Sequence, residues 1–148
     1  MSHPNLIESE AELGEIVRAA RTVAVLGMRD ETHADTAAYR IPVMLKERGL
    51  RVIPINPRIA SSLGEPSLPG VGALAEAVDI LDVFRRPEFI PAHAEEILAL
   101  PPERRPQVVW LQSGIRHDAA AEKLAAAGVR VVQDACLGVY AARYRAQV

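Results

Sequence analysis

Arginine side chains follow several short apolar runs of this 148-residue sequence. Such runs are typical of strands buried on both faces, and ligands of open parallel sheets bind beyond the carboxyl ends of the strands. Arginine binds phosphate oxygens through two parallel charge-assisted hydrogen bonds, and helix N-termini add backbone N–H groups. The pattern therefore predicts a site for a ligand with more than one phosphate group. The arginines concerned are Arg29, Arg40, Arg58, Arg85 and Arg86.

A different interpretation of the same arginines stays open. Each of them could form an ordinary surface ion pair, since Asp30, Glu31 and Glu88 lie close by in the sequence. For a single arginine the two interpretations are about equally good. For a set of arginines gathered at one sheet edge, the ligand site is favoured.

The loops lack the standard signatures of other nucleotide sites. A dinucleotide site has G-x-G-x-x-G after the first strand and an acidic residue about twenty positions later. Here Gly27 is the only glycine of the first loop, GMRDET, and Asn56-Pro57-Arg58 stands where the acid is expected. NAD is therefore not expected, although Arg58 could accept the 2′-phosphate of NADP. The Walker pattern G-x-x-x-x-G-K-[ST] is absent, which argues against an ATPase.

No catalytic or metal-binding constellation is evident. Cys136 is the only cysteine, which excludes an internal disulfide and paired-cysteine metal motifs. It could be a reactive thiol at a helix start, but burial as a small apolar side chain is favoured. His33 is expected to be a solvated loop residue and His93 a surface or half-buried helix residue. Asp79 and Asp82 bracket a buried strand and are too isolated in sequence to be proposed as a catalytic carboxylate pair.

Helix-like and strand-like segments alternate along the chain. Ser9 begins a capping box with Glu12, and apolar residues at helical spacing follow. Strands are expected at 22–27, 51–55, 79–84, 108–111 and 129–132, with Trp110 in the core. Helices are expected at 9–20, 39–48, 87–99, 117–127 and 135–145.

This alternation predicts an α/β fold, a Rossmann-like three-layer domain with a mostly parallel sheet and helices on both faces. Residues 1–148 are expected to form a single domain. Residues 57–74 are rich in Pro, Gly and Ser and should form a long loop with a short strand near 66–68. Pro42 and Pro91 fall within predicted helices, and each requires a helix that begins a turn or less before it.

Composition points to an ordinary globular protein. Hydrophobic residues make up 49% and charged residues 24%, and the net charge is −2. Neither nucleic acid nor a membrane is indicated as a partner. The N-terminal segment has no basic region followed by an apolar one, so it does not resemble a secretory signal. A cytoplasmic protein is expected.

Several motifs occur in the order typical of one family. They are VAVLG, a polar loop ending in Tyr39-Arg40, RVIPINPR, GEPSLPGV, DILDVFRRPE, VVWLQSGI and GVRVVQDAC. This order resembles the small stand-alone CoA-binding protein family and, more distantly, the CoA-binding domain of the succinyl-CoA synthetase alpha subunit. The resemblance runs from about residue 12 to about residue 140. It implies a protein that binds coenzyme A or an acyl-CoA.

The resemblance also implies which loops contact the coenzyme. The first loop would bind the ADP portion and its phosphates, and the second would lie against the nucleotide. The third would border the coenzyme, and the fourth would lie near the pantetheine. The residues are Gly27, Met28, Arg29, Tyr39 and Arg40 in the first; Asn56, Pro57 and Arg58 in the second; Phe84, Arg85 and Arg86 in the third; and Gln112, Ser113 and Gly114 in the fourth.

Three functions remain open at this point. The synthetases need a phosphorylated histidine in a second domain and a partner subunit, and nothing in this chain matches either. A CoA-binding protein without catalytic machinery is therefore favoured over an enzyme that uses NADP or an acyl-CoA through unrecognised residues. The third possibility is an interaction protein that forms a homodimer through its N-terminal and C-terminal helices.

Overall fold

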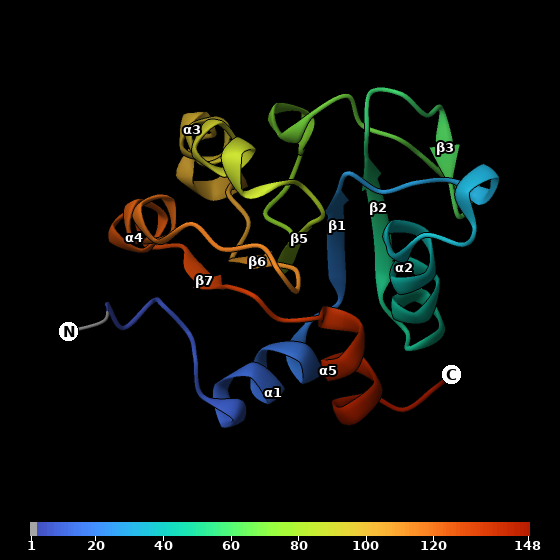
Figure 1. The fold of residues 1–148 in the computed structure, drawn as a ribbon, viewed down its shortest axis with the longest axis horizontal. Helices are drawn as coiled ribbons and strands as arrows, with labels where there is room; N and C mark the ends of the chain where they lie inside the picture. Colours follow the sequence, from blue (N-terminus) through green and yellow to red (C-terminus); the bar gives the residue numbers. More distant parts are fainter. Residues whose placement is uncertain (1–2) are drawn as a thin grey trace.

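A five-stranded parallel sheet forms the centre of the computed structural model, which describes residues 3–148 (Figure 1). The strands lie in the order β2-β1-β5-β6-β7, and every neighbouring pair is parallel. Their residues are almost all buried, as expected for a parallel sheet covered on both faces. The predicted α/β, Rossmann-like fold is confirmed. The strands are β1 (Thr22–Leu26), β2 (Arg51–Ile55), β5 (Ile80–Val83), β6 (Val108–Leu111) and β7 (Arg130–Val132).

Helices cover both faces of the sheet (Figure 1). One face carries α1 (Glu10–Ala19), α2 (Ala37–Glu47) and α5 (Leu137–Tyr144), and the other carries α3 (Ile90–Ala99) and α4 (Asp118–Ala126). Short 3-10 turns occur at Glu31–His33, Val71–Ala73, Pro87–Phe89 and Pro102–Arg104. The helix expected at 87–99 is therefore a 3-10 turn followed by α3. At the start of α1, the Ser9 hydroxyl accepts the Glu12 N–H at 3.1 Å, as predicted for a cap.

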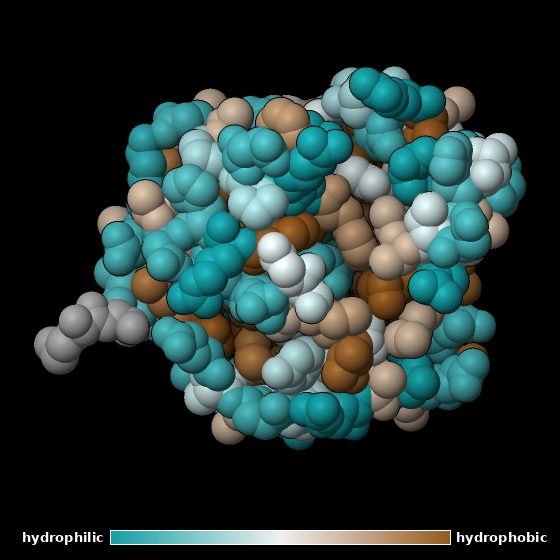
Figure 2. All heavy atoms as spheres, in the orientation of Figure 1, coloured by the Kyte–Doolittle hydropathy of each residue, from teal (hydrophilic) through white to brown (hydrophobic). Residues whose placement is uncertain are grey.

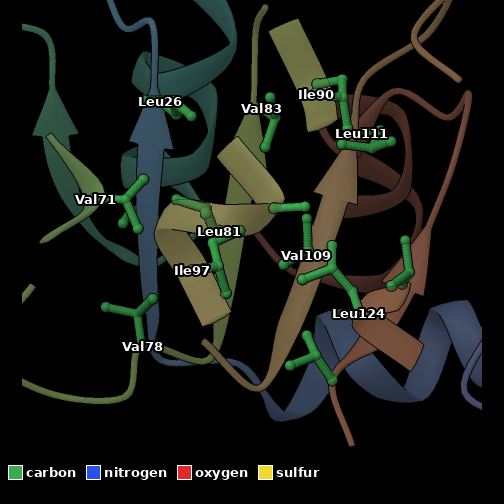
Figure 3. Close-up of a cluster of buried hydrophobic side chains, with 14 of the residues drawn as sticks. Leu26, Val71, Val78, Leu81, Val83, Ile90, Ile97, Val109, Leu111 and Leu124 are labelled. Atoms are coloured by element: carbon green, nitrogen blue, oxygen red, sulfur yellow. The ribbon is translucent and has the colours of Figure 1, made fainter. Parts of the chain in front are cut away.

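Two hydrophobic cores hold these layers together. The core between the sheet and α3 and α4 brings side chains from β1, β5 and β6 against Ile90, Ile97 and Leu124 (Figure 3). The core on the opposite face is built around Trp110, which is fully buried. Its indole Nε1–H donates to the carbonyl of Ala135 at 2.9 Å, so its one polar group is satisfied. The strand tryptophan is a core residue, as predicted.

Both outer strands of the sheet are paired with irregular segments. On the β2 side, the Leu68 N–H donates to the Pro54 carbonyl and the Leu68 carbonyl accepts the Asn56 N–H, each at 2.9 Å. On the β7 side, Val131 exchanges hydrogen bonds with Asn5 and Ile7 at 2.8 and 2.9 Å. The short strand expected near 66–68 lies slightly earlier. It is β4 (Glu65–Pro66), antiparallel to β3 (Ser61–Ser62).

The two helical prolines behave differently. Pro91 is the second residue of α3, where its missing N–H is not needed, as predicted. Pro42 lies well inside α2, which begins at Ala37, so the expectation of a helix start within one turn of Pro42 is wrong. Without a donor from Pro42, the Ala38 carbonyl is available outside the helix. It accepts the Arg29 N–H at 3.1 Å, which ties the loop after β1 to α2.

Figure 2 shows one face of the molecule, with hydrophilic side chains along much of its rim and apolar side chains interspersed toward its centre. The large apolar side chains that are exposed within residues 3–148 are those of Phe89, Val139 and Val148. No helix in this part of the chain is long and apolar enough to cross a membrane.

Candidate functional site

The strand order creates a switch point between β1 and β5. The chain leaves β1 toward α2 and β2 on one side, and leaves β5 toward α3 and β6 on the other. The two loops therefore diverge beyond the carboxyl ends of adjacent strands, and a crevice is expected there. The predicted arginine loops lie at this position.

Gly27 lets the two loops approach closely. Its φ is +87°, and a Cβ at this position would lie 2.5 Å from the carbonyl oxygen of Phe84. The Gly27 N–H donates to Ile55 and the Phe84 N–H donates to Leu26, both at 2.9 Å. The hydrogen bonding between strands thus continues for one residue past the ends of β1 and β5. Only glycine fits at the point where the loops after these two strands meet.

A cavity of about 830 Å³ opens at this point. Its wall contains residues of the first three predicted loops, together with side chains from the 3-10 turn after β1, the loop before Val71 and helix α3. The predicted residues in the wall are Gly27, Arg29, Asn56, Pro57, Arg58, Phe84, Arg85 and Arg86.

The other predicted site residues lie outside this wall. Met28 is fully buried in the core next to α2 and α5, so its side chain is not available to a ligand. Tyr39 and Arg40 lie in the first turn of α2. Ser113 and Gly114 are exposed after β6, where the Gly114 N–H donates to the Asp134 carboxylate at 2.6 Å. Gln112 also lies outside the cavity wall.

Asn56 braces the loops of the cavity. Its side-chain Nδ2 donates to the Met28 carbonyl at 2.8 Å, and its Oδ1 accepts the Arg58 N–H at 2.9 Å. Ser62 adds a second link, because its hydroxyl donates to the Arg29 carbonyl at 2.9 Å. These bonds hold Arg29 and Arg58 on adjacent loops, so asparagine serves here as a structural link between them.

The cavity concentrates positive charge in a chain whose net charge is −2. Arg29, Arg58, Arg85 and Arg86 line it, against the carboxylates of Asp30 and Glu96. Within residues 3–148, no ion pair joins any of these four guanidinium groups to a carboxylate. The surface-pairing interpretation of these arginines is therefore not supported.

The carboxylate of Asp30 is used within its own loop. It accepts the Thr32 N–H at 3.1 Å and so caps the 3-10 turn after β1. The hydrogen bond from the Thr32 hydroxyl is the main cause that lowers the pKa of Asp30. His33 follows in this turn, exposed and in the cavity wall.

Helix α3 contributes two residues that were not predicted to belong to the site, although His93 is half-buried on a helix as expected. His93 and Glu96 line the cavity, and His93 Nδ1 lies 2.6 Å from Glu96 Oε1. Arg85 Nε–H donates to His93 Nε2 at 3.2 Å, and its guanidinium carbon lies 4.6 Å from the centre of the Phe89 ring. The i, i+3 spacing of His93 and Glu96 on a predicted helix was the available signal.

A buried acid lies outside the cavity. The side chain of Asp82, in β5, is fully buried, and Gln112 Nε2 donates to both of its carboxylate oxygens at 2.8 and 2.9 Å. Burial raises the pKa of Asp82 to about 8, which outweighs the opposing effect of the Gln112 hydrogen bonds. Gln112 is itself buried and is committed to this contact.

The remaining candidates have ordinary surroundings. Cys136 is half-buried and immediately precedes α5. His117 caps α4, since its Nδ1 accepts the Ala120 N–H at 3.1 Å. Across residues 3–148, no three or more His, Cys, Asp or Glu side chains are grouped so that they could hold a metal ion.

Comparison with known families shows which family the chain belongs to. The family described as "CoA binding domain" matches residues 21–142, which include every loop of the cavity. The chain belongs to this CoA-binding domain family. The predicted resemblance is confirmed.

Relatives of this CoA-binding domain have a similar length, and those with solved structures share its fold. The uncharacterized protein YneT of Bacillus subtilis is 32% identical over 131 residues, which cover 88% of this chain and 93% of YneT. A solved structure from Thermus thermophilus is 41% identical with a TM-score of 0.83, covering 93% of this chain and 99% of the other. A hypothetical protein from Pyrococcus horikoshii, 22% identical with a TM-score of 0.80, covers 97% of this chain and 96% of its own and shares the fold.

Proposed function

We propose that this CoA-binding domain binds coenzyme A, or an acyl-CoA, in the cavity between the loops after β1, β2 and β5. The phosphates of the ligand contact Arg29, Arg58, Arg85 and Arg86. The proposal covers both ligands because the nucleotide portion, which these residues contact, is common to them.

The observation that supports this proposal is the set of unpaired arginines around the cavity. Four guanidinium groups line one cavity, and within residues 3–148 none of them has a carboxylate partner. A polyanion would neutralise these charges, and bidentate hydrogen bonds to phosphate suit the guanidinium group. Coenzyme A supplies a pyrophosphate and a 3′-phosphate on one molecule.

The size and the position of the cavity agree with a nucleotide ligand. Its volume of about 830 Å³ is in the usual range for small-molecule sites, roughly 300–1,000 Å³. The cavity does not extend to Ser113 or Gly114 after β6. We therefore place the nucleotide in the cavity, with the pantetheine arm leaving it along the carboxyl edge of the sheet toward β6.

Calorimetric titration of the nucleotide-stripped protein tests the proposal. The ligands are CoA, 3′-dephospho-CoA and NADP, and the variants are Arg58→Ala and Arg85→Ala. Each lost charge-assisted contact should cost about 1.5–3 kcal/mol, so affinity for CoA should fall by about tenfold to a hundredfold. Arg21→Ala is the matched control, because Arg21 is exposed at the opposite end of β1 and should leave affinity unchanged.

The comparison ligands separate the competing functions. Tight binding of CoA, weaker binding of 3′-dephospho-CoA and no binding of NADP support the proposal. Binding of NADP in preference to CoA would point to the enzyme that we considered as an alternative. No binding of CoA by the wild-type protein would reject the proposed function, and unchanged affinity in both arginine variants would reject the arginine assignment.

A further inference from the structure

His93 and Glu96 form a hydrogen-bonded chain that ends on one arginine of the cavity. Glu96 Oε1 lies 2.6 Å from His93 Nδ1, and His93 Nε2 lies 3.2 Å from Arg85 Nε. All three side chains line the cavity. The side chain of His93 is only 16% exposed, so its ring is held between its two partners.

The partners fix the tautomer of the histidine. A carboxylate only accepts hydrogen bonds, so His93 Nδ1 must carry the proton that faces Glu96. Arginine only donates, so His93 Nε2 must present its lone pair to Arg85. The two contacts require the same neutral tautomer, in which Nδ1 is protonated and Nε2 accepts.

The hydrogen bonds from Glu96 through His93 immobilise one edge of the Arg85 guanidinium group. Its Nε–H donates to His93, and its guanidinium carbon lies over the Phe89 ring, 4.6 Å from the ring centre. The two terminal nitrogens have no hydrogen-bond partner within residues 3–148. They form the pair of donors that a phosphate group accepts from. The arginine is thereby oriented before any ligand arrives, which lowers the ordering cost of binding.

We propose that His93, oriented by Glu96, is a positioning residue that holds Arg85 ready for a phosphate group of the ligand. This inference rests on the proposed function, because it assigns a role to residues around the same cavity. It explains why a carboxylate lies in the wall of a site for a polyanion. Glu96 acts through the histidine and the arginine rather than on the ligand.

A double-mutant cycle with CoA titration tests the coupling. His93→Phe keeps the ring size and removes the acceptor, and should weaken CoA binding by about threefold to tenfold. The same substitution should have almost no effect in an Arg85→Ala background. In an Arg86→Ala background it should keep its full effect, since the only arginine hydrogen-bonded to His93 within residues 3–148 is Arg85. Equal effects in the two backgrounds would overturn the proposal.

Two further variants separate positioning from general packing and from charge. His93→Gln retains an acceptor oxygen near the position of Nε2 and should restore most of the affinity lost in His93→Phe. Glu96→Ala removes a negative charge, so a direct effect of charge would tighten CoA binding. The positioning role predicts weaker binding, and tighter binding would contradict it.

One readout is independent of CoA. Nitrogen-15 shifts of the His93 ring in the ligand-free protein should report the tautomer protonated at Nδ1. The other tautomer would overturn the inference, whatever the titrations show. The wild-type protein could instead fail to bind CoA while the His93 ring has the expected tautomer. That result would reject the proposed function but would still support the hydrogen-bonded arrangement of Glu96, His93 and Arg85.

Discussion

Asp82 should make the stability of the folded protein fall as pH rises. The carboxyl group is fully buried between Val25 and Trp110, its neighbours in register on β1 and β6. Burial raises its pKa from the ordinary value of 3.8 to about 8. Between these two pH values the native protein retains a proton that the unfolded chain releases. The contribution of Asp82 to stability is therefore fully present below about pH 4 and is lost as pH rises toward 8.

The size of this effect follows from the pKa difference. One proton contributes a slope of about 1.4 kcal/mol per pH unit to the free energy of unfolding. Between pH 5 and pH 7, Asp82 should lower that free energy by about 3 kcal/mol. Asp82→Asn removes the titration and keeps an oxygen that can accept from Gln112. The free energy of unfolding of the variant, relative to that of the wild type, should therefore rise steadily from pH 5 to pH 7.

Urea denaturation of both proteins at pH 5, 6, 7 and 8 measures the effect. Subtracting the two free energies of unfolding at each pH cancels the histidines, which titrate in both proteins. The difference should change by about 3 kcal/mol between pH 5 and pH 7 and level off near pH 8. A difference that is constant across the range would mean that Asp82 is ionised in the native protein. The hydrogen bonds from Gln112 would then outweigh burial, contrary to our reasoning.

Two substitutions test the backbone of the site. Gly27→Ala places a Cβ 2.5 Å from the Phe84 carbonyl oxygen at a φ of +87°, and thermal or chemical denaturation should show a loss of about 2 kcal/mol or more. Normal stability in this variant would show that the loops after β1 and β5 separate easily. Pro42→Ala restores a helical N–H that competes for the Ala38 carbonyl, so the Arg29 amide should exchange hydrogen faster and CoA affinity should fall. Unchanged exchange at Arg29 would show that its bond to Ala38 does not depend on the proline.

The sheet and much of the cavity could be predicted from the sequence because both depend on local pattern. Five short apolar runs became the five strands, with ends within a residue or two of the expected bounds. The topology of alternating elements then placed three loops at one edge. Gly27, Arg58 and Arg85 came together for that reason.

What the sequence did not indicate depends on packing between distant segments. His93 and Glu96 enter the cavity only because α3 packs beside the loop after β5. Gln112 was expected to face the ligand, but its side chain turns inward to Asp82. That pairing depends on the register of β5 and β6, which cannot be obtained from the spacing of residues along one chain.

The covered edges of the sheet constrain how this protein can associate with other chains. An open outer strand invites pairing with a strand of another molecule, which leads to sheet extension or aggregation. Here Leu68 is bonded to the β2 edge, and Asn5 and Ile7 are bonded to Val131 on the β7 edge. A second copy could add a strand only by first displacing one of these segments. Self-association of the folded chain should therefore proceed through helical or loop surfaces, and removing the segment before α1 should expose a β7 edge prone to fibre formation.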